Sequence, residues 1–376
     1  MKLKLKTASL KLWLTRVMKN IKGGRSSVPV LETVRLEADE EGHLTLDFTN
    51  LDQWQKVTFP ADVSSGGGVL VNADRFSKAV GLLEDEEITL EETQKGLSLK
   101  GKFASYTFAV LPAGEFPAEP AAVPAGLDGT VSFSCTGNFL ASAIEAVYFS
   151  LCKDDGRFAL HSVKLEVFPK AIRMVTTDGR RLSIIDRDLA SGSASKGSLL
   201  IPSAAIKAMK SLASDAADSQ IQLYADERGV DLWWGDWWLR SKLQDAEFPN
   251  YKQVIPSYAD RQSVVIVVEE WQKAVAGVLA IGSEENKLTI AGNRISLEAP
   301  EIGSAWMEVS PTDAEEVTLN PRYLLEALKA APSIKAAFLP GKSGEPVVMT
   351  MPNQTDADPI RWTHVLMPIR TSGGSK

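Results

Sequence analysis

The stretch Val69-Leu-Val-Asn-Ala-Asp-Arg-Phe-Ser-Lys-Ala-Val-Gly-Leu-Leu83 changes at Asn72 from a strand-like apolar run to the spacing of an amphipathic helix. An Asn at a helix start can accept a hydrogen bond from a free backbone N–H. The same change occurs at Leu199–Leu212 and at Val317–Leu328, so the junctions at residues 72, 202 and 320 are 130 and 118 residues apart. We interpret them as one strand-to-helix step in three copies of a repeated unit.

Other features recur in the same order. The motif Val34-Arg-Leu-Glu37 returns as Val163-Lys-Leu-Glu166, and Glu115-Phe-Pro117 returns as Glu247-Phe-Pro249. A second helical pattern precedes each junction, at Ser9–Lys22, Thr136–Ser150 and Glu269–Ala280. The sequence therefore predicts an α+β fold of three repeated domains, residues 1–126, 127–256 and 257–376, each with two helices and about eight strands. Chance similarity of three αβ segments is the alternative.

The charge is distributed unevenly along the chain. The 376 residues include 41 Lys or Arg and 48 Asp or Glu, a net charge of −7, which taken alone argues against a nucleic-acid partner. The six helical windows nevertheless sum to +6 and the remainder to −13, and Ser9–Lys22 carries four bases and no acid. This segregation suits a protein whose helices face phosphates. A preference for Lys and Arg on exposed helix faces is the alternative.

The cysteine count and the N-terminus bear on the compartment. Cys135 and Cys152 are too few for a disulfide framework and indicate a reducing environment. The N-terminus is basic but has no unbroken apolar segment and no small-residue cleavage site, so it is not a signal peptide. The apolar run Val264–Val268 is too short to cross a bilayer. We expect a cytoplasmic protein.

No residue pattern indicates catalysis or metal binding. The three histidines, His43, His161 and His364, have no partner at metal-ligand spacing, and no His-Glu-x-x-His or Cys-x-x-Cys motif occurs. Leu339-Pro-Gly-Lys-Ser343 lacks the first Gly of a phosphate loop and predicts a hairpin turn. We expect no catalytic residue, no metal, no cofactor and no enzymatic activity. An enzyme with a site of unrecognised type is the alternative.

Two clusters leave their role open. Asp178-Gly-Arg-Arg-Leu182 predicts a tight turn that places two guanidiniums beside an apolar residue, either as a binding site or as a solvated hairpin. Asp231-Leu-Trp-Trp-Gly-Asp-Trp-Trp-Leu239 holds four tryptophans in one hairpin. Alternation predicts that Trp234 and Trp238 face one side, where they serve core packing or a partner surface.

Six short motifs give the chain a family resemblance over nearly its whole length. They are Gly23-Gly-Arg-Ser-Ser-Val-Pro-Val-Leu31, Leu111-Pro-Ala-Gly-Glu-Phe-Pro117, Thr176-Thr-Asp-Gly-Arg-Arg-Leu182, Ser241–Tyr251 with Val254-Ile-Pro256, Asn320-Pro-Arg-Tyr-Leu-Leu325, and Met367-Pro-Ile-Arg370. In this order and spacing the chain resembles the bacterial DNA polymerase sliding clamps, the β subunits of the replicative polymerase.

The resemblance implies a fold and a function. Three copies of one αβ domain per subunit would join head to tail with a second subunit into a closed ring, with helices lining the hole and antiparallel sheets outside. The ring would encircle duplex DNA without sequence preference, slide, and tether the polymerase as a processivity factor. Replicative DNA polymerase and clamp loader would bind through short linear peptides, and the subunit would be a homodimer with no membrane partner. Enclosure would hold the ring on DNA, so individual contacts can stay weak.

The resemblance also suggests residues for DNA contact. Arg25, in the loop after the first helix, falls where the family touches DNA. Position on an inner helix and charge extend this expectation to Lys11, Arg16, Lys19, Lys22, Arg75, Lys78, Lys207 and Lys210.

A partner-peptide pocket is implied between the second and third domains, near the C-terminus. The family's pocket accepts short peptides that contain a Gln and hydrophobic residues. Carried over, it would be formed by Leu160, Thr177, Gly179, Arg180, Arg181, Leu182, Pro249, Val254, Val365, Met367, Pro368, Ile369 and Arg370. The Asp178–Leu182 turn is thereby favoured as functional, because an apolar slot with a polar rim captures a short linear motif.

Subunit contacts and departures complete the expectation. The family joins the first domain of one subunit to the third domain of the other, which maps to Arg75, Tyr106 and Phe108 on one side and to Ala280 and Ile281 on the other. Departures lie near the pocket: Arg180 replaces a frequent His, Gln253 replaces a frequent base, and Thr371–Lys376 extends the usual end. A clamp-fold binding module that recruits partners without encircling DNA is the alternative function.

Overall fold

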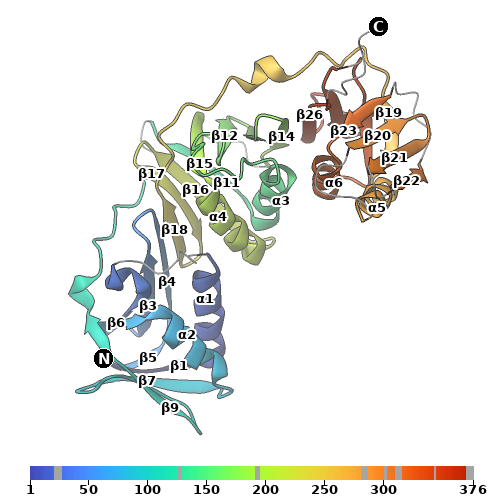
Figure 1. Cartoon of the computed structure of the whole chain (residues 1–376). Helices are drawn as coiled ribbons and strands as arrows, with labels where there is room; N and C mark the ends of the chain where they lie inside the picture. The colour runs from blue at the N-terminus through green and yellow to red at the C-terminus, as the bar shows by residue number, and fades with distance from the viewer. Residues whose placement is uncertain are drawn as a thin grey trace. The chain divides into compact units, whose positions relative to one another are not determined.

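The computed structural model describes residues 1–20, 28–124, 129–190, 195–280, 287–299, 303–309, 316–342 and 344–369 (Figure 1). The chain forms two compact units. Unit 1 comprises Met1–Asn138 and Ala204–Leu243, and unit 2 comprises Phe139–Ser203 and Gln244–Lys376.

The helices form where the sequence predicts them. Asn72 caps its helix by accepting a hydrogen bond from the N–H of Arg75 at 3.1 Å, and Asn320 accepts from the N–H groups of Arg322 and Tyr323 at 3.0 and 3.3 Å. The strand-to-helix junctions are therefore confirmed, together with the local reason for both asparagines. In the part of the chain that the structure describes, the helices are α1 (Thr7–Asn20), α2 (Ala73–Leu82), α3 (Gly137–Tyr148), α4 (Ser203–Ala216), α5 (Val268–Leu279) and α6 (Pro321–Ala330).

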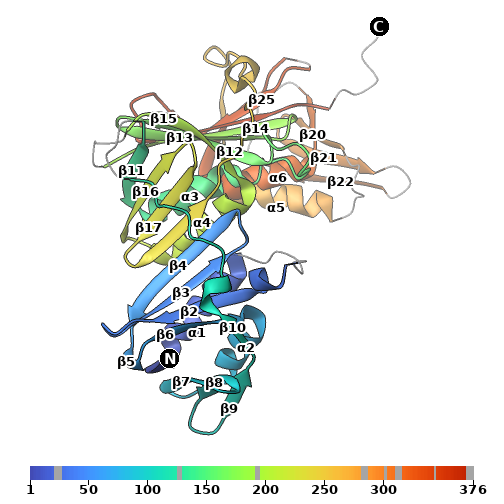
Figure 2. The ribbon, with the colours of Figure 1, turned by 90° about the vertical axis from the view of Figure 1, so that its left-hand side faces the viewer.

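Unit 1 holds two antiparallel sheets with α1, α2 and nearly all of α4. Helix α1 buries Leu10, Leu14 and Val17, which lie on one face, and packs beside α2 (Figure 2). The nine-stranded sheet follows the order β10 (Val110–Pro112), β6 (Gly67–Asn72), β2 (Thr33–Ala38), β3 (His43–Thr49), β4 (Gln53–Pro60), β18 (Trp237–Ser241), β17 (Gly229–Trp234), β16 (Gln220–Asp226), β11 (Val131–Thr136). The five-stranded sheet follows the order β5 (Asp62–Ser65), β1 (Lys2–Lys6), β7 (Glu87–Thr93), β8 (Gly96–Lys100), β9 (Ser105–Phe108).

Unit 2 is built in the same way around α5, α6 and nearly all of α3. Helices α5 and α6 lie side by side, and α6 buries Leu324, Ala327 and Leu328. The eight-stranded sheet follows the order β15 (Gly197–Pro202), β12 (Ser162–Phe168), β13 (Ala171–Thr177), β14 (Arg181–Asp188), β26 (Ile360–Leu366), β25 (Val347–Thr350), β24 (Lys335–Leu339), β19 (Val264–Val267). The four-stranded sheet follows the order β22 (Gly303–Glu308), β21 (Arg294–Ala299), β20 (Lys287–Ala291), β23 (Val317–Leu319).

Two of these sheets run across the expected repeats. Strand β4 pairs with β18 inside unit 1, and β14 pairs with β26 inside unit 2. In each case the third strand after the first helix of one repeat pairs with the third strand after the second helix of the next repeat. Backbone hydrogen bonds thus join the strands of two repeats into one continuous sheet. Each compact unit therefore contains a whole shared sheet and does not coincide with a single repeat. The boundaries at residues 126 and 256 stay predictions.

The tryptophan hairpin corrects one expectation. Strands β17 and β18 place Trp234 opposite Trp237 and Trp233 opposite Trp238, so these cross-strand pairs share faces. Their rings stack with centroids 6.4 and 5.8 Å apart. The expectation that Trp234 and Trp238 face one side is wrong, because a two-residue turn with Gly235 at φ 53° lies between the strands and interrupts the alternation.

Two smaller expectations concern a loop and membranes. The Leu339–Ser343 segment joins β24 to β25, which pair antiparallel, so it is a hairpin turn as predicted; Ser343 lies outside the described residues.

No helix among the described residues is long and apolar enough to span a membrane.

Candidate functional site

The turn between β13 and β14 is held by its own side chains. Asp178 Oδ1 accepts hydrogen bonds from the N–H groups of Arg180 and Arg181 at 2.9 and 3.1 Å. Thr177 Oγ1 donates to the carbonyl of Arg181 at 2.6 Å and accepts from the N–H of Gly179 at 3.1 Å. Gly179 has φ 89°, a conformation that favours glycine. The turn therefore presents Arg180 and Arg181 in a fixed arrangement.

Arg181 connects this turn to helix α6 and to the residue that follows α3. Its side chain is only 2% exposed, and its guanidinium donates to Asp178 at 2.9 Å, to Glu326 of α6 at 2.5 Å and to the carbonyl of Phe149 at 2.7 Å. Its charge also lies 4.2 Å from the ring centroid of Tyr323. These partners satisfy a buried cation that would otherwise be costly to desolvate.

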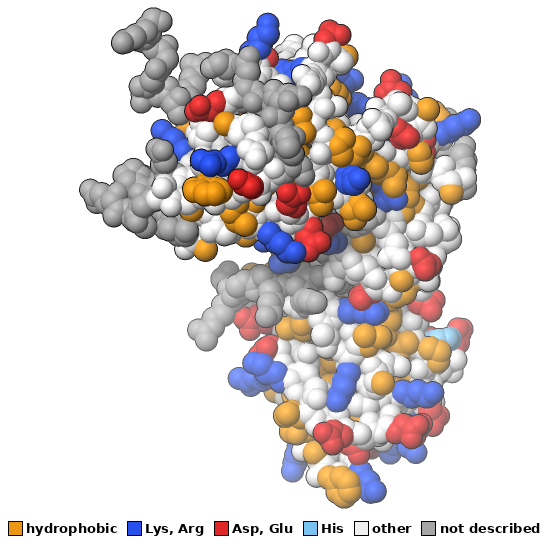
Figure 3. Space-filling model, turned by 90° about the vertical axis from the view of Figure 1, so that its right-hand side faces the viewer, with side chains coloured by type: hydrophobic (Ala, Val, Ile, Leu, Met, Phe, Trp, Pro, Cys, Tyr) orange, Lys and Arg blue, Asp and Glu red, His pale blue; other side chains and the backbone are white. Residues whose placement is uncertain are grey.

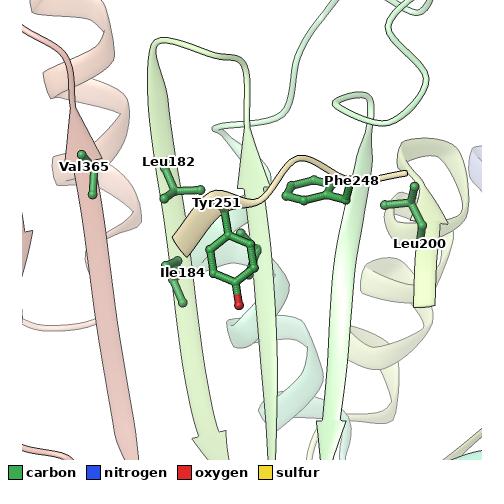
Figure 4. Close-up of a cluster of buried hydrophobic side chains, with 7 residues drawn as sticks. Leu182, Ile184, Leu200, Phe248, Tyr251 and Val365 are labelled. Carbon is green, nitrogen blue, oxygen red and sulfur yellow. The ribbon is translucent and has the colours of Figure 1, made fainter. Parts of the chain in front are cut away.

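An apolar cluster lies beside the turn, on the sheet that joins β14 to β26 (Figure 4). Leu182 and Val365 are cross-strand partners, and both are buried. The segment after β18 lays Phe248 and Tyr251 across them. The Tyr251 hydroxyl donates to Glu166 at 2.6 Å, and burial, reinforced by that carboxylate, raises the pKa of Tyr251 to about 12.

Exposed apolar residues surround this cluster. Val254 is 58% exposed and Met367 46% exposed, Pro249 is exposed, and Pro368 and Ile369 are half-buried. Leu160 and Thr177 are buried. Exposed apolar side chains thus follow closely in the chain on buried ones, and such a surface can receive the apolar side chains of a partner.

Two of the last described residues are hydrogen-bonded to other parts of unit 2. The N–H of Met367 donates to the carbonyl of Arg180 at 3.0 Å, and the N–H of Ile369 donates to the carbonyl of Thr318 at 2.9 Å. These bonds tie the end of the third repeat to the turn of the second and to β23. Arg370 lies outside the described residues.

A charged cavity of about 360 Å³ opens on the other side of Arg181. The expected residues Arg180 and Arg181 line it. Sequence reasoning missed several further lining residues, although Asn320-Pro-Arg-Tyr was one of the motifs that carried the resemblance. These residues are Lys153, Arg157, Asn320, Arg322, Tyr323 and Glu326.

The first junction between repeats contains the same turn with different side chains. Asn50 Oδ1 accepts from the N–H groups of Asp52 and Gln53 at 3.1 and 2.8 Å, as Asp178 does in the second junction. The N–H of Lys242 donates to the carbonyl of Asp52 at 2.9 Å, as Met367 does to Arg180. Gln53 stands in the place of Arg181, so the ion pairs of the second junction have no counterpart here.

Arg16 contacts an aspartate and three tryptophan rings inside unit 1. Its Nε lies 2.8 Å from Asp215 Oδ2 of α4, and its side chain is 17% exposed. The guanidinium carbon lies 6.0, 5.6 and 5.9 Å from the ring centroids of Trp13, Trp234 and Trp237. Arg16 therefore joins α1 to α4 and to the tryptophan hairpin, and its charge is offset by Asp215.

The other residues expected to contact DNA differ in their exposure and in whether they form ion pairs. Lys207 and Arg75 are exposed, Lys11 is half-buried, and Lys78 is exposed but pairs with Asp74 at 2.7 Å. Lys210 is half-buried, and that burial lowers its pKa. On the face drawn in Figure 3 the two signs of charge are interspersed. Lys22, Arg25 and the side chain of Lys19 lie outside the described residues.

The expected subunit-contact residues lie at or near edge strands. Strand β9, with Tyr106 and Phe108, ends the five-stranded sheet, and the Phe108 ring meets Phe76 edge-on at 5.6 Å. Ala280 follows α5, which packs against β22, the strand that ends the four-stranded sheet. Ile281 lies outside the described residues.

The histidines serve the fold among the described residues. His161 bonds the carbonyl of Cys152 at 2.7 Å and the hydroxyl of Ser203 at 2.6 Å. His364 is fully buried beside Ser183 at 2.8 Å, and burial lowers its pKa to about 3. His43, the first residue of β3, is half-buried and lies near the exposed Asp39 and Glu41, with one ligand atom of each within 4.8 Å of the others.

Comparisons with known proteins agree with this architecture. A family model of the DNA polymerase III beta subunit, N-terminal domain, matches residues 1–120, and the model of its central domain matches residues 135–250. The beta sliding clamp of Synechococcus elongatus is 26% identical over 367 residues, which cover 92% of this chain and 93% of that protein.

Solved structures extend the likeness to the whole chain. The DNA polymerase III beta subunit of Thermotoga maritima matches with a TM-score of 0.85 at 25% identity, covering 99% of this chain and 100% of that chain. A sliding clamp from Bartonella birtlesii, bound to griselimycin, matches with a TM-score of 0.86, also at 25% identity and with the same coverage.

Proposed function

Because the chain belongs to the DNA polymerase III beta subunits, the beta sliding clamps, we infer that it is a DNA sliding clamp, a non-enzymatic processivity factor. Its partners as a sliding clamp are duplex DNA and a DNA polymerase. The more detailed statements below about the ring, the DNA contacts and the peptide pocket are our proposals for this chain.

The ring proposal rests on one observation, the rule by which repeats join. The third strand after the first helix of a repeat pairs with the third strand after the second helix of the following repeat, as in β4–β18 and β14–β26. Under that rule β22 of the third repeat needs a partner, and β9 of the first repeat is the matching strand. Both end their sheets in the described residues. A head-to-tail contact of β22 with β9 of a second copy closes two chains into one ring of six domains.

The three domains are residues 1–126, 127–256 and 257–376 under this proposal. Phe108, packed on Phe76, and Tyr106 supply one side of the subunit contact, and Ala280 lies on the other. Trp306 and Met307 of β22 are 53% and 39% exposed, which supports the use of this strand as an interface.

DNA contact is assigned to helix bases that are exposed or half-buried. The exposed Lys207 and Arg75 and the half-buried Lys11 fit non-specific attraction to phosphates, whereas Arg16 serves the fold. The loop with Arg25 remains a proposed contact from the family resemblance.

Partner binding is assigned to the slot over Leu182 and Val365. Polymerase and clamp loader would insert short segments with hydrophobic side chains there, and the backbone of Arg180 and Met367 frames the entrance. Arg180 adds a positive charge at the rim, so acidic flanking residues are favoured in the partner.

Solution mass tests the ring directly. We expect a species of two chains, each of 40.8 kDa, at micromolar concentration by sedimentation velocity. Replacing Trp306 by Lys should shift the mass toward one chain, whereas Lys170→Glu, on an exposed turn, should not. A monomer for the unchanged protein would contradict the ring. The comparisons do not favour the alternative of a non-encircling module.

A further inference from the structure

A groove of about 610 Å³ opens in unit 2 where α5 begins and α6 ends. It is separate from the charged cavity, which uses Arg322, Tyr323 and Glu326 of α6, whereas the groove uses Leu328 and Lys329 and residues that follow the helix. Val267, Pro332 and Ile334 give it apolar walls.

Three apolar side chains of this region are exposed. Ile334 is 83% exposed, Val265 44% and Val267 39%, while Ile266 between the two valines is fully buried. The alternation places Val265 and Val267 on the outer face of β19. We refer to Val265, Val267 and Ile334 as the apolar face.

One backbone hydrogen bond identifies the same place in all three repeats. The first residue of the first helix donates to the residue just before the strand that follows the second helix. The three bonds are Thr7 to Glu86 at 2.9 Å, Gly137 to Ser219 at 3.0 Å, and Val268 to Ile334 at 3.0 Å.

The other two repeats are polar at the positions of the apolar face. The first repeat has Lys4, Lys6 and Glu86 there. The second repeat has Ser134, Thr136 and Ser219. The fold of a repeat therefore forms without apolar residues at these positions. The three exposed apolar side chains of the third repeat, Val265, Val267 and Ile334, are not needed for that fold and indicate another role.

The charges at the groove are unbalanced. Lys329 and Lys335 are exposed lining residues, and neither makes an ion pair with a carboxylate among the described residues. Glu269, the acidic lining residue, is paired with Lys273 at 2.6 Å. An incoming carboxylate would meet two uncompensated lysines beside an apolar wall.

We propose that this groove is a second docking site, for a short segment of a partner protein in which aliphatic side chains are followed by carboxylates. The aliphatic side chains pack on Ile334 and Val267, and the carboxylates approach Lys329 and Lys335. Helix α6 has ten residues, about 15 Å of helix, so the site is at the opposite end of the helix from the charged cavity.

A labelled peptide tests the proposal on the full chain. The probe is fluorescein-Gly-Leu-Leu-Asp-Glu-Asp-amide, with a second peptide in which Asn and Gln replace the acids. We expect saturable anisotropy for the acidic peptide alone, weakened about tenfold by Ile334→Ser and by Lys335→Glu. Lys170→Glu, an equal charge change on an exposed turn, should leave it unchanged.

The outcomes separate this site from others. No saturable binding at millimolar peptide, or equal binding by all variants, overturns the proposal. A change of oligomeric mass in Ile334→Ser also overturns it, because the face would then belong to a contact between copies. The variants keep the slot over Leu182 intact, so binding of a Gln-containing hydrophobic peptide there reports separately on the proposed function.

Discussion

Glu326 on α6 lies 2.5 Å from Arg181 on β14, and this ion pair joins the third repeat to the Asp178–Leu182 turn of the second, beside the proposed peptide slot. Arg181 is 2% exposed and Glu326 29% exposed at their side chains. A charge pair of this depth is costly to break, because the remaining guanidinium stays buried.

Replacing Glu326 by Ala should therefore lower the free energy of unfolding by about 2 kcal/mol, as expected for a buried charge that loses a hydrogen-bonded partner. Urea denaturation measures the change. Glu345→Ala is the matched control, since Glu345 is 48% exposed and pairs with Arg261 at 3.1 Å. It should cost less than about 0.5 kcal/mol. Equal costs for the two variants would contradict the structural role of Arg181–Glu326.

Met367→Ser and Val254→Ser should each weaken binding of a Gln-containing hydrophobic peptide by about tenfold. Both side chains are exposed beside the cluster of Leu182 and Val365, so the variants should fold normally. Fluorescence anisotropy with a labelled peptide measures the affinity. Val265→Ser removes another exposed valine, 44% exposed, at a different site and should leave this affinity unchanged. An unchanged affinity in the first two variants would place the peptide elsewhere.

Arg16→Gln and Lys207→Glu should separate folding from DNA contact. Arg16 is engaged with Asp215 and three indole rings, so its loss should lower the melting temperature. Lys207 is exposed, so its reversal should weaken retention on DNA and reduce the salt dependence by about one phosphate contact without altering stability. If Arg16→Gln melts like the unchanged protein but loses DNA, Arg16 is a DNA contact after all.

His364 should make stability depend on pH. Burial, with the nearby charge of Arg181, lowers its pKa from 6.5 to about 3 in the folded chain. The unfolded chain therefore binds a proton below pH 6.5 that the folded chain does not, and the stabilisation present above that pH falls as pH decreases toward 3.

Between pH 6.5 and 5 the unchanged protein should lose about 2 kcal/mol more unfolding free energy than His364→Gln. Urea denaturation at the two pH values measures this difference. Identical slopes for the unchanged protein and His364→Gln would show that the buried imidazole does not contribute.

The parts of the fold that could be predicted from sequence are those with local causes. Asn72 and Asn320 cap helices through bonds to residues two or three positions away, so the pattern of neighbouring residues predicts the junctions. The turn at Asp178 is equally local, since its bonds stay within Thr177–Arg181.

The remaining features depend on residues far apart in the chain. Arg16 was expected to face DNA, yet its partner Asp215 is about 200 residues away, and no pattern around either residue indicates the pair. Glu326 was missed for the same reason, because its link to Arg181 exists only once the third repeat packs on the second. The prediction that Trp234 and Trp238 lie on the same face of the sheet is wrong because side-chain alternation does not continue through the turn between β17 and β18.

Retention on circular DNA distinguishes a ring that encloses DNA from a protein held on it by charge. The clamp, loaded by its loader onto nicked circular DNA, should remain bound through gel filtration at a salt concentration that removes simple electrostatic contacts, and linearising the circle should release it. We expect retention on the circle and loss from the linear form, since enclosure and not affinity holds the ring. Equal retention on both forms, or retention on neither, would contradict an encircling clamp.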